Sequence, residues 1–126
     1  MSQGRGSAGP AMFIVVALLC LVVQFEAVHG ATFIVGGSGG WTFNLSNWPN
    51  GKRFRAGDIL VFNYNPTFHN VVAVNRGGYS GCSTPAGAKV FQTGKDRIRL
   101  DKGQNYFICN FPGHCQSGMK IAVNAA

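Results

Sequence analysis

Short apolar and β-branched runs, separated by clusters of Gly, Pro and Asn, recur along residues 31–126. Runs of this kind predict strands at 31–35, 59–64, 69–75, 97–100, 104–109 and 120–123. Regularly spaced short strands with turns between them, about seven in all, are typical of a β-sandwich or barrel. Few apolar residues recur at the spacing of a helix, so the pattern allows at most a short helix between Trp41 and Lys52 or around Cys82. The pattern therefore predicts one all-β domain without internal repeats.

The first thirty residues follow a different pattern. Arg5 gives a basic start, residues 11–23 form an unbroken apolar run, and Gly30 ends a short, more polar stretch. This is the layout of a secretory signal peptide, and the apolar run is too short to span a bilayer. The alternative, an uncleaved amphipathic or core helix, is disfavoured because the run has no apolar periodicity. We therefore expect a signal peptide at 1–30 and an exported domain at 31–126, with no membrane anchor.

The predicted domain is strongly basic, with ten Lys and Arg side chains against three Asp. The positive residues concentrate at 52–55 and 89–102. Such a balance is common in nucleic-acid binders, but the export signal and the lack of a nucleic-acid motif argue against that class. An acidic polysaccharide or an acidic protein fits better as a partner, although a solvated basic surface needs no partner. Three carboxylates also supply hydrolytic chemistry poorly.

The number of cysteines in the predicted domain is odd. Cys20 lies in the predicted signal peptide, which leaves Cys82, Cys109 and Cys115. An oxidising compartment favours pairing of two of them, and the third would be a free thiol unless something occupies it. A bound metal would occupy it, but the count alone does not say which cysteine is unpaired.

One eleven-residue segment brings a thiolate, an imidazole and a thioether close together. Cys109 ends a predicted strand, and Pro-Gly at 112–113 turns the chain so that His114 faces the same point. Met119 then opens the last strand, and His69, after a Pro-containing turn, is the best fourth group. Taken singly, Met119 reads as core filler, His69 as a surface histidine and Cys109 as a buried or paired cysteine. Their combination indicates a metal site.

The types of donor in this segment select the metal. One thiolate and two imidazoles form a trigonal set that suits both oxidation states of copper, and a weak axial thioether completes it. Structural zinc usually takes four Cys or His ligands, and iron–sulfur clusters need about four cysteines. The sequence therefore predicts one type 1 copper ion held by His69, Cys109, His114 and Met119.

Five motifs extend the interpretation to the whole predicted domain. They are VGGSGGW at 35–41, FRAGD at 54–58, HNVV at 69–72, GC at 81–82 followed by TPAG at 84–87, and YFICNFPGHC at 106–115. Together they resemble the phytocyanin family of the cupredoxin superfamily, and within it the plantacyanin branch of plant basic blue proteins. The resemblance implies a Greek-key barrel of two sheets with copper near one end. It also implies the same four ligands and a disulfide between Cys82 and Cys115.

The resemblance carries three further expectations. Other phytocyanins have Gln in place of Met119 or lack the copper ligands. The presence of Met119 with the other three ligands implies a protein that can bind copper, with a higher reduction potential than in the phytocyanins that have Gln. Asn70 is expected to brace the loop that carries Cys109 through hydrogen bonds, and such support tunes a metal. Separately, Asn44-Leu45-Ser46 is an N-glycosylation sequon in a chain predicted to be exported.

These observations favour a secreted, monomeric electron carrier in which copper cycles between +1 and +2. By resemblance, electrons pass near His114 at the apolar end of the barrel. Because protein groups fill the coordination, no position stays open for a substrate, so no enzyme activity is expected. The alternative is an extracellular signalling or cell-wall matrix-binding protein whose basic surface matters more than its redox chemistry. The redox partner is unknown, and charge favours an acidic protein or cell-wall polysaccharide.

Overall fold

The structure, a computed structural model, describes residues 30–126 and contains seven strands within that range. They are β1 (Thr32–Ile34), β2 (Ile59–Asn63), β3 (Val71–Val74), β4 (Lys89–Phe91), β5 (Lys95–Arg99), β6 (Gly103–Ile108) and β7 (Lys120–Ala125). A 3-10 helix, η1 (Gly37–Gly39), and one short α-helix, α2 (Arg76–Gly81), accompany them. The predicted signal peptide lies outside the described residues, except for Gly30. Within the described part, no helix has the length and apolar character needed to cross a membrane.

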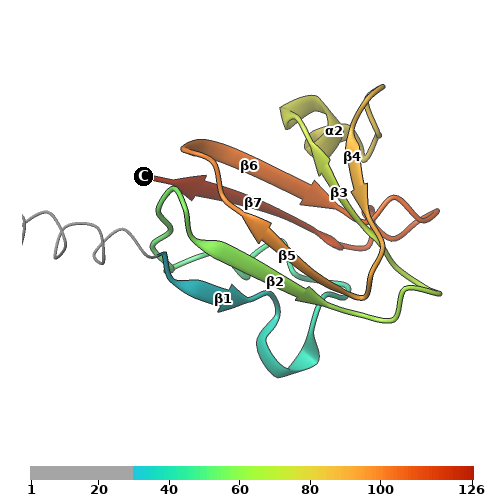
Figure 1. The fold of residues 1–126 in the computed structure, drawn as a ribbon. Helices are drawn as coiled ribbons and strands as arrows, with labels where there is room; N and C mark the ends of the chain where they lie inside the picture. Colours follow the sequence, from blue (N-terminus) through green and yellow to red (C-terminus); the bar gives the residue numbers. More distant parts are fainter. Residues whose placement is uncertain (1–29) are drawn as a thin grey trace, which may run out of the picture.

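The strands form two sheets that enclose one core (Figure 1). One sheet has the order β1-β2-β5 and the other β4-β3-β6-β7, so the chain changes sheet after β2, β4 and β5. β1 pairs with β2 in parallel, and the remaining strand pairs are antiparallel. The predicted all-β sandwich is confirmed.

Alternating burial explains why these segments form strands. β5 turns Ile98 toward the core and its neighbours outward, and β2 does the same with Leu60 and Phe62, which are fully buried. Trp41 packs edge-on against Phe62, with ring centroids 5.0 Å apart. Full burial of a side chain of this size contributes about 1.5–3 kcal/mol relative to its exposure. The core thus determines which face of each sheet is buried, and it thereby positions the loops at the ends of the strands.

The structure shows where the short helix lies and adds one strand to those expected from the sequence. Of the two places where the sequence left room for a short helix, the one near Cys82 holds α2, with the Asn75 side chain accepting a hydrogen bond from the Gly78 N–H at its start (2.8 Å), and 41–52 forms turns. β4 was not predicted, because a three-residue strand with little burial has no alternation to detect. β4 exists by pairing with β3.

Candidate metal centre

The loop that joins β6 to β7 lies at one end of the barrel, at the right in Figure 1, and it carries His114. His69 precedes β3, Cys109 follows β6, and Met119 precedes β7. Because β6 is antiparallel to both β3 and β7, the end of β6 meets the beginnings of its two neighbours. Sheet pairing therefore brings His69 to the other three groups from far away in the sequence.

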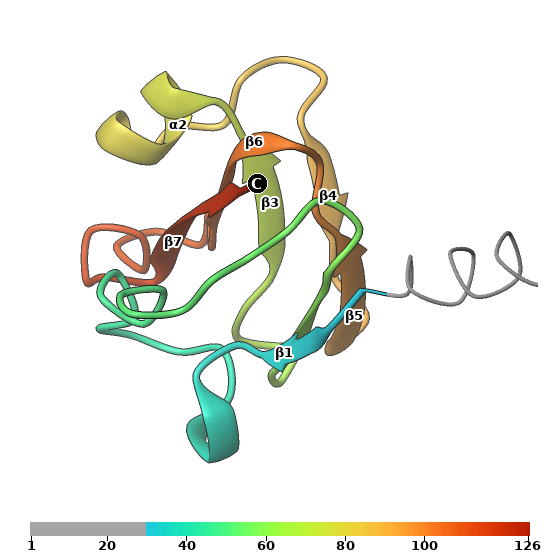
Figure 2. The ribbon, with the colours of Figure 1, turned by 90° about the vertical axis from the view of Figure 1, so that its left-hand side faces the viewer.

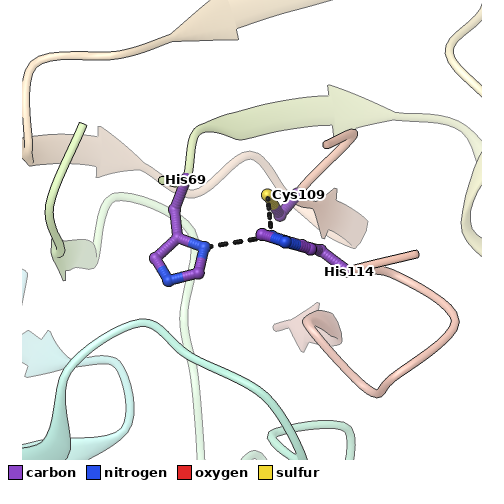
Figure 3. A group of neighbouring side chains, drawn as sticks. All are labelled: His69, Cys109 and His114. Carbon is purple, nitrogen blue, oxygen red and sulfur yellow. Dashed lines mark hydrogen bonds between the residues drawn. The ribbon is translucent and has the colours of Figure 1, made fainter. Parts of the chain in front are cut away.

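Three of the predicted ligands converge on one point (Figure 3). The Nδ1 atoms of His69 and His114 are 3.1 Å apart, and the Cys109 sulfur lies 3.5 Å from Nδ1 of His114. One ligand atom from each residue lies within 4.8 Å of the others. Two imidazole nitrogens and a sulfur directed at a common point are the donor set that a trigonal copper site requires.

Met119 is attached to this group through its main chain. Its carbonyl accepts a hydrogen bond from the Cys109 N–H (3.0 Å), and its own N–H donates to the His114 carbonyl (3.1 Å). The side chain is fully buried and belongs to the same core cluster as Cys109. Its role as the fourth ligand stays a prediction.

Tight turns hold the loop between Cys109 and Met119 against a distant segment. Gly118 has a φ of 83°, which strains any other residue, and a Cβ at this position would lie only 3.0 Å from the Asn44 Cα, a tight contact that also favours glycine. The N–H groups of Asn44 and Leu45 donate to the carbonyls of Ser117 and Gly118 (3.2 and 2.9 Å). The ligand loop is therefore held by the 44–45 segment as well as by its own strands.

Burial sets the protonation of the donor groups. It raises the pKa of the Cys109 thiol, and the backbone N–H groups of Asn70 and Phe111 near the sulfur act in the opposite direction. Burial also lowers the pKa of His69, helped by the neighbouring His114. A neutral His69 keeps its lone pair for a metal, whereas the Cys109 proton must leave when a metal binds.

Asn70 links the start of β3 to the Cys109 loop, as expected. Its side chain donates to Oδ1 of Asn110 (2.7 Å) and accepts from the Asn110 N–H (3.0 Å). Its backbone carbonyl accepts from the Trp41 indole N–H (2.9 Å), so a buried core residue holds Asn70 in place. The two asparagines fasten together the loops that carry His69 and Cys109.

Replacing Asn70 with Ala should lower the free energy of unfolding by about 1–3 kcal/mol, because two hydrogen bonds between the loops are lost. The reduction potential and visible spectrum of the copper-loaded protein should shift as well, since the Cys109 loop loses its brace. Chemical unfolding and voltammetry measure the two effects. Thr84→Ala is the matched control, because it removes only the exposed bond from Asn110 to Thr84. An unchanged spectrum and potential in Asn70→Ala would contradict the bracing role.

Sequence reasoning missed three phenylalanines around the histidines. Phe43 contacts both imidazole rings edge-on, with centroid distances of 5.6 Å to His69 and 5.0 Å to His114. Phe68 and Phe43 are 59% and 39% exposed, and with Phe111 they line a shallow hollow of about 420 Å³ over the two histidines. Only the unusual exposure of large apolar rings marks this face, and exposure is not visible in the sequence.

The disulfide implied by the resemblance is present. Cys82 and Cys115 are bonded, with their Cα atoms 5.6 Å apart. Cys109 is the free cysteine of the described residues and is buried. The bridge therefore anchors the residue next to His114 and leaves the Cys109 thiol for a metal.

Comparison with known proteins agrees with this geometry. The model of the plastocyanin-like domain family matches residues 41–119. A basic blue protein of Arabidopsis thaliana is 59% identical over 128 residues, which cover 99% of each chain. Among solved structures, the cucumber basic protein, a blue copper protein, is 75% identical with a TM-score of 0.76, covering 76% of this chain and 100% of that one. Spinach plantacyanin is 61% identical with a TM-score of 0.65, covering 69% of this chain and 94% of that one. The chain belongs to the plastocyanin-like domain family, in the plantacyanin branch of the phytocyanins.

Proposed function

We propose that this protein binds one copper ion and carries single electrons outside the cell. The observation that supports this function best is the convergence of His69, Cys109 and His114 within 4.8 Å. Bound copper would supply the chemistry by cycling between +1 and +2. His69, Cys109 and His114 would hold the ion, the Met119 thioether would add a weak fourth donor, and this donor set suits both oxidation states.

The protein holds these residues rigidly, which suits electron transfer. The Cys109 loop is fixed by the main chain of Met119, the side chain of Asn70 and the disulfide at Cys115. A loop braced in this way would rearrange little when the copper changes its oxidation state. The protein would act as a carrier and not as an enzyme, because His69, Cys109, His114 and Met119 would together hold the copper and leave no position for a substrate.

Electrons would enter and leave through the His114 imidazole. This ring and that of His69 line the hollow edged by Phe43, Phe68 and Phe111. The apolar surface lets a partner approach closely without desolvating charged groups. The rest of the centre is buried, so the histidine face is the short route for an electron.

The visible spectrum of the copper-loaded protein tests this function. A Cu(II)–thiolate centre should give an intense absorption that disappears on reduction and returns on oxidation, whereas zinc loading should give no colour. A copper-loaded protein without this absorption would overturn the proposal.

Replacing Met119 with Gln should lower the reduction potential by at least about 60 mV, a tenfold change in a one-electron equilibrium. An amide oxygen donates more strongly to Cu(II) than a thioether does, so it stabilises the oxidised state. Voltammetry of the two copper-loaded proteins measures the difference. Met119→Leu, which removes the axial donor, should move the potential in the opposite direction. An unchanged potential in Met119→Gln would remove Met119 from the ligand set.

The extracellular location is supported by two features besides the predicted signal peptide. The Cys82–Cys115 disulfide is typical of an oxidising compartment. In addition, Asn44 of the sequon is exposed, so its side chain is accessible to the glycosylation that exported proteins undergo.

Asn44 should therefore carry a glycan when the full chain is produced in a eukaryotic secretory host. Deglycosylation should lower the mass of the secreted protein, and Ser46→Ala, which breaks the sequon, should remove that shift. Thr67→Ala is the matched control, because Pro66 prevents Asn65 from being an acceptor. A secreted wild-type protein without a mass shift would contradict the prediction.

A further inference from the structure

A cleft of about 440 Å³ is lined by residues of both sheets, none of them a predicted copper ligand. It runs beside β4 and β5, the edge strands of the two sheets, which lie on the same side of the barrel (Figure 2). Lys89, Phe91, Arg97, Arg99, Asp101 and Gln104 are among its lining residues. Sites that bind small ligands have volumes of about 300–1,000 Å³, so the cleft is large enough for a ligand.

The charge of this lining favours anions. Lys89, Arg97 and Arg99 are all exposed, and Asp101 is the one carboxylate in the lining. Arg97 and Arg99 are two residues apart on the outward face of β5, which separates their Cα atoms by about 7 Å. Each guanidinium can hold a carboxylate through paired hydrogen bonds. The cleft can therefore bind two neighbouring carboxylates of one chain.

The acids of the domain do not compete with such a ligand. Asp58 and Asp96 are each 4% exposed and are bonded internally. Asp58 accepts from two backbone N–H groups, and Asp96 accepts from the hydroxyls of Tyr64 and Thr93. Of the Asp and Glu residues in the described part of the chain, only Asp101 is exposed. A polyanion that approaches the described surface meets an almost uniformly positive field.

The uncharged groups of the cleft favour a sugar chain over a nucleic acid. Half-buried Phe91 gives the cleft an apolar wall, and the Lys89 ammonium lies over its ring, 5.0 Å from the centre. Exposed Gln104 offers an amide that can both donate to and accept from hydroxyl groups. Proteins that bind single-stranded nucleic acid stack successive bases on several aromatic rings. The lining of this cleft has only one aromatic ring that is not buried, that of Phe91.

We propose that this cleft binds a short segment of a polyuronate, an acidic polysaccharide whose sugars carry carboxylates. Arg97 and Arg99 take the carboxylates, Phe91 with the Lys89 side chain over its ring forms the apolar wall beside the sugars, and Gln104 binds hydroxyl groups. Gln104 lies near the start of β6 and Cys109 just after its end, about 17 Å apart along the strand. The protein can therefore hold a matrix polymer while its histidine face stays free.

Calorimetric titration of the copper-loaded protein with an oligomer of galacturonic acid tests the proposal. Arg97→Gln with Arg99→Gln should weaken binding at least about tenfold. Gln104→Ala should weaken it at least about twofold without changing the charge, and Asp101→Asn should strengthen it. The matched control is Lys52→Gln with Arg53→Gln, which removes the same charge from a different surface and should change the affinity less than about twofold.

Two further arms keep the outcome clear. The methyl-esterified oligomer should bind much more weakly, and each variant should keep the visible absorption of the parent protein, which shows that it is folded. Equal losses in the two double variants would mean a diffuse charge effect and overturn the proposal. Absence of binding, or tighter binding of an acidic protein or of DNA than of the oligomer, would also overturn it.

Discussion

Replacing Cys109 with Ser should abolish the intense visible absorption of the copper-loaded protein. That absorption requires charge transfer between a thiolate and Cu(II), and Cys109 is the free cysteine of the described residues. Copper affinity should fall more than about 100-fold, because loss of groups that merely support ligands already costs up to that much. Absorption spectroscopy and copper titration against a competing chelator measure both effects.

A buried site requires a control for folding. Cys109 is fully buried, so the Cys109→Ser protein should first be shown to keep its disulfide and its far-ultraviolet circular dichroism. Met119→Leu is the matched variant: it changes a buried residue of the same centre but keeps the thiolate and both imidazoles, and it should stay coloured. A folded Cys109→Ser protein with undiminished colour would place the copper elsewhere.

Removing the disulfide with Cys82→Ala and Cys115→Ala should lower the free energy of unfolding of the metal-free protein by roughly 3–4 kcal/mol. The bridge joins residues 33 positions apart, and opening it frees a loop of that length in the unfolded chain. Because Cys115 follows His114, the copper-loaded variant should also release copper faster. Denaturant unfolding and stopped-flow chelation measure the two quantities.

A chemical control separates the bridge from the side chains. Metal-free wild-type protein kept under a thiol reductant, without alkylation, should lose a similar amount of stability. If the double Ala variant lost less than about 1 kcal/mol, the bridge would contribute little beyond local packing, and its proposed role in anchoring the His114 loop would be wrong.

Much of the candidate centre could be predicted because it is local in the chain. Cys109, His114 and Met119 fall within eleven residues, and a turn between two strands brings such residues together whatever the rest of the fold does. His69 could be predicted from its chemistry, but its convergence on Cys109 depends on the pairing of β3 with β6, which no local pattern encodes.

The missed features depend on contacts between distant segments. Phe43 reaches the histidines because Trp41, two residues earlier, is buried in the core and bonded to Asn70. Strand β4 forms only because it pairs with β3, some sixteen residues away in the chain. The spacing of hydrophobic residues along the chain does not encode such contacts. The strands were therefore predicted better than the side chains around the metal centre.

The close contact between Gly118 and Asn44 has a consequence for protein engineering. The loop from Cys109 to Met119 holds three of the four predicted ligands, so it invites transfer to another protein as a single segment. Part of its shape, however, comes from hydrogen bonds to Asn44 and Leu45. A transplant of this loop alone into another β-barrel would lose those bonds and the Phe43 ring beside them. A graft that keeps the native colour and potential should need residues 41–45 to travel with the loop, as one discontinuous unit.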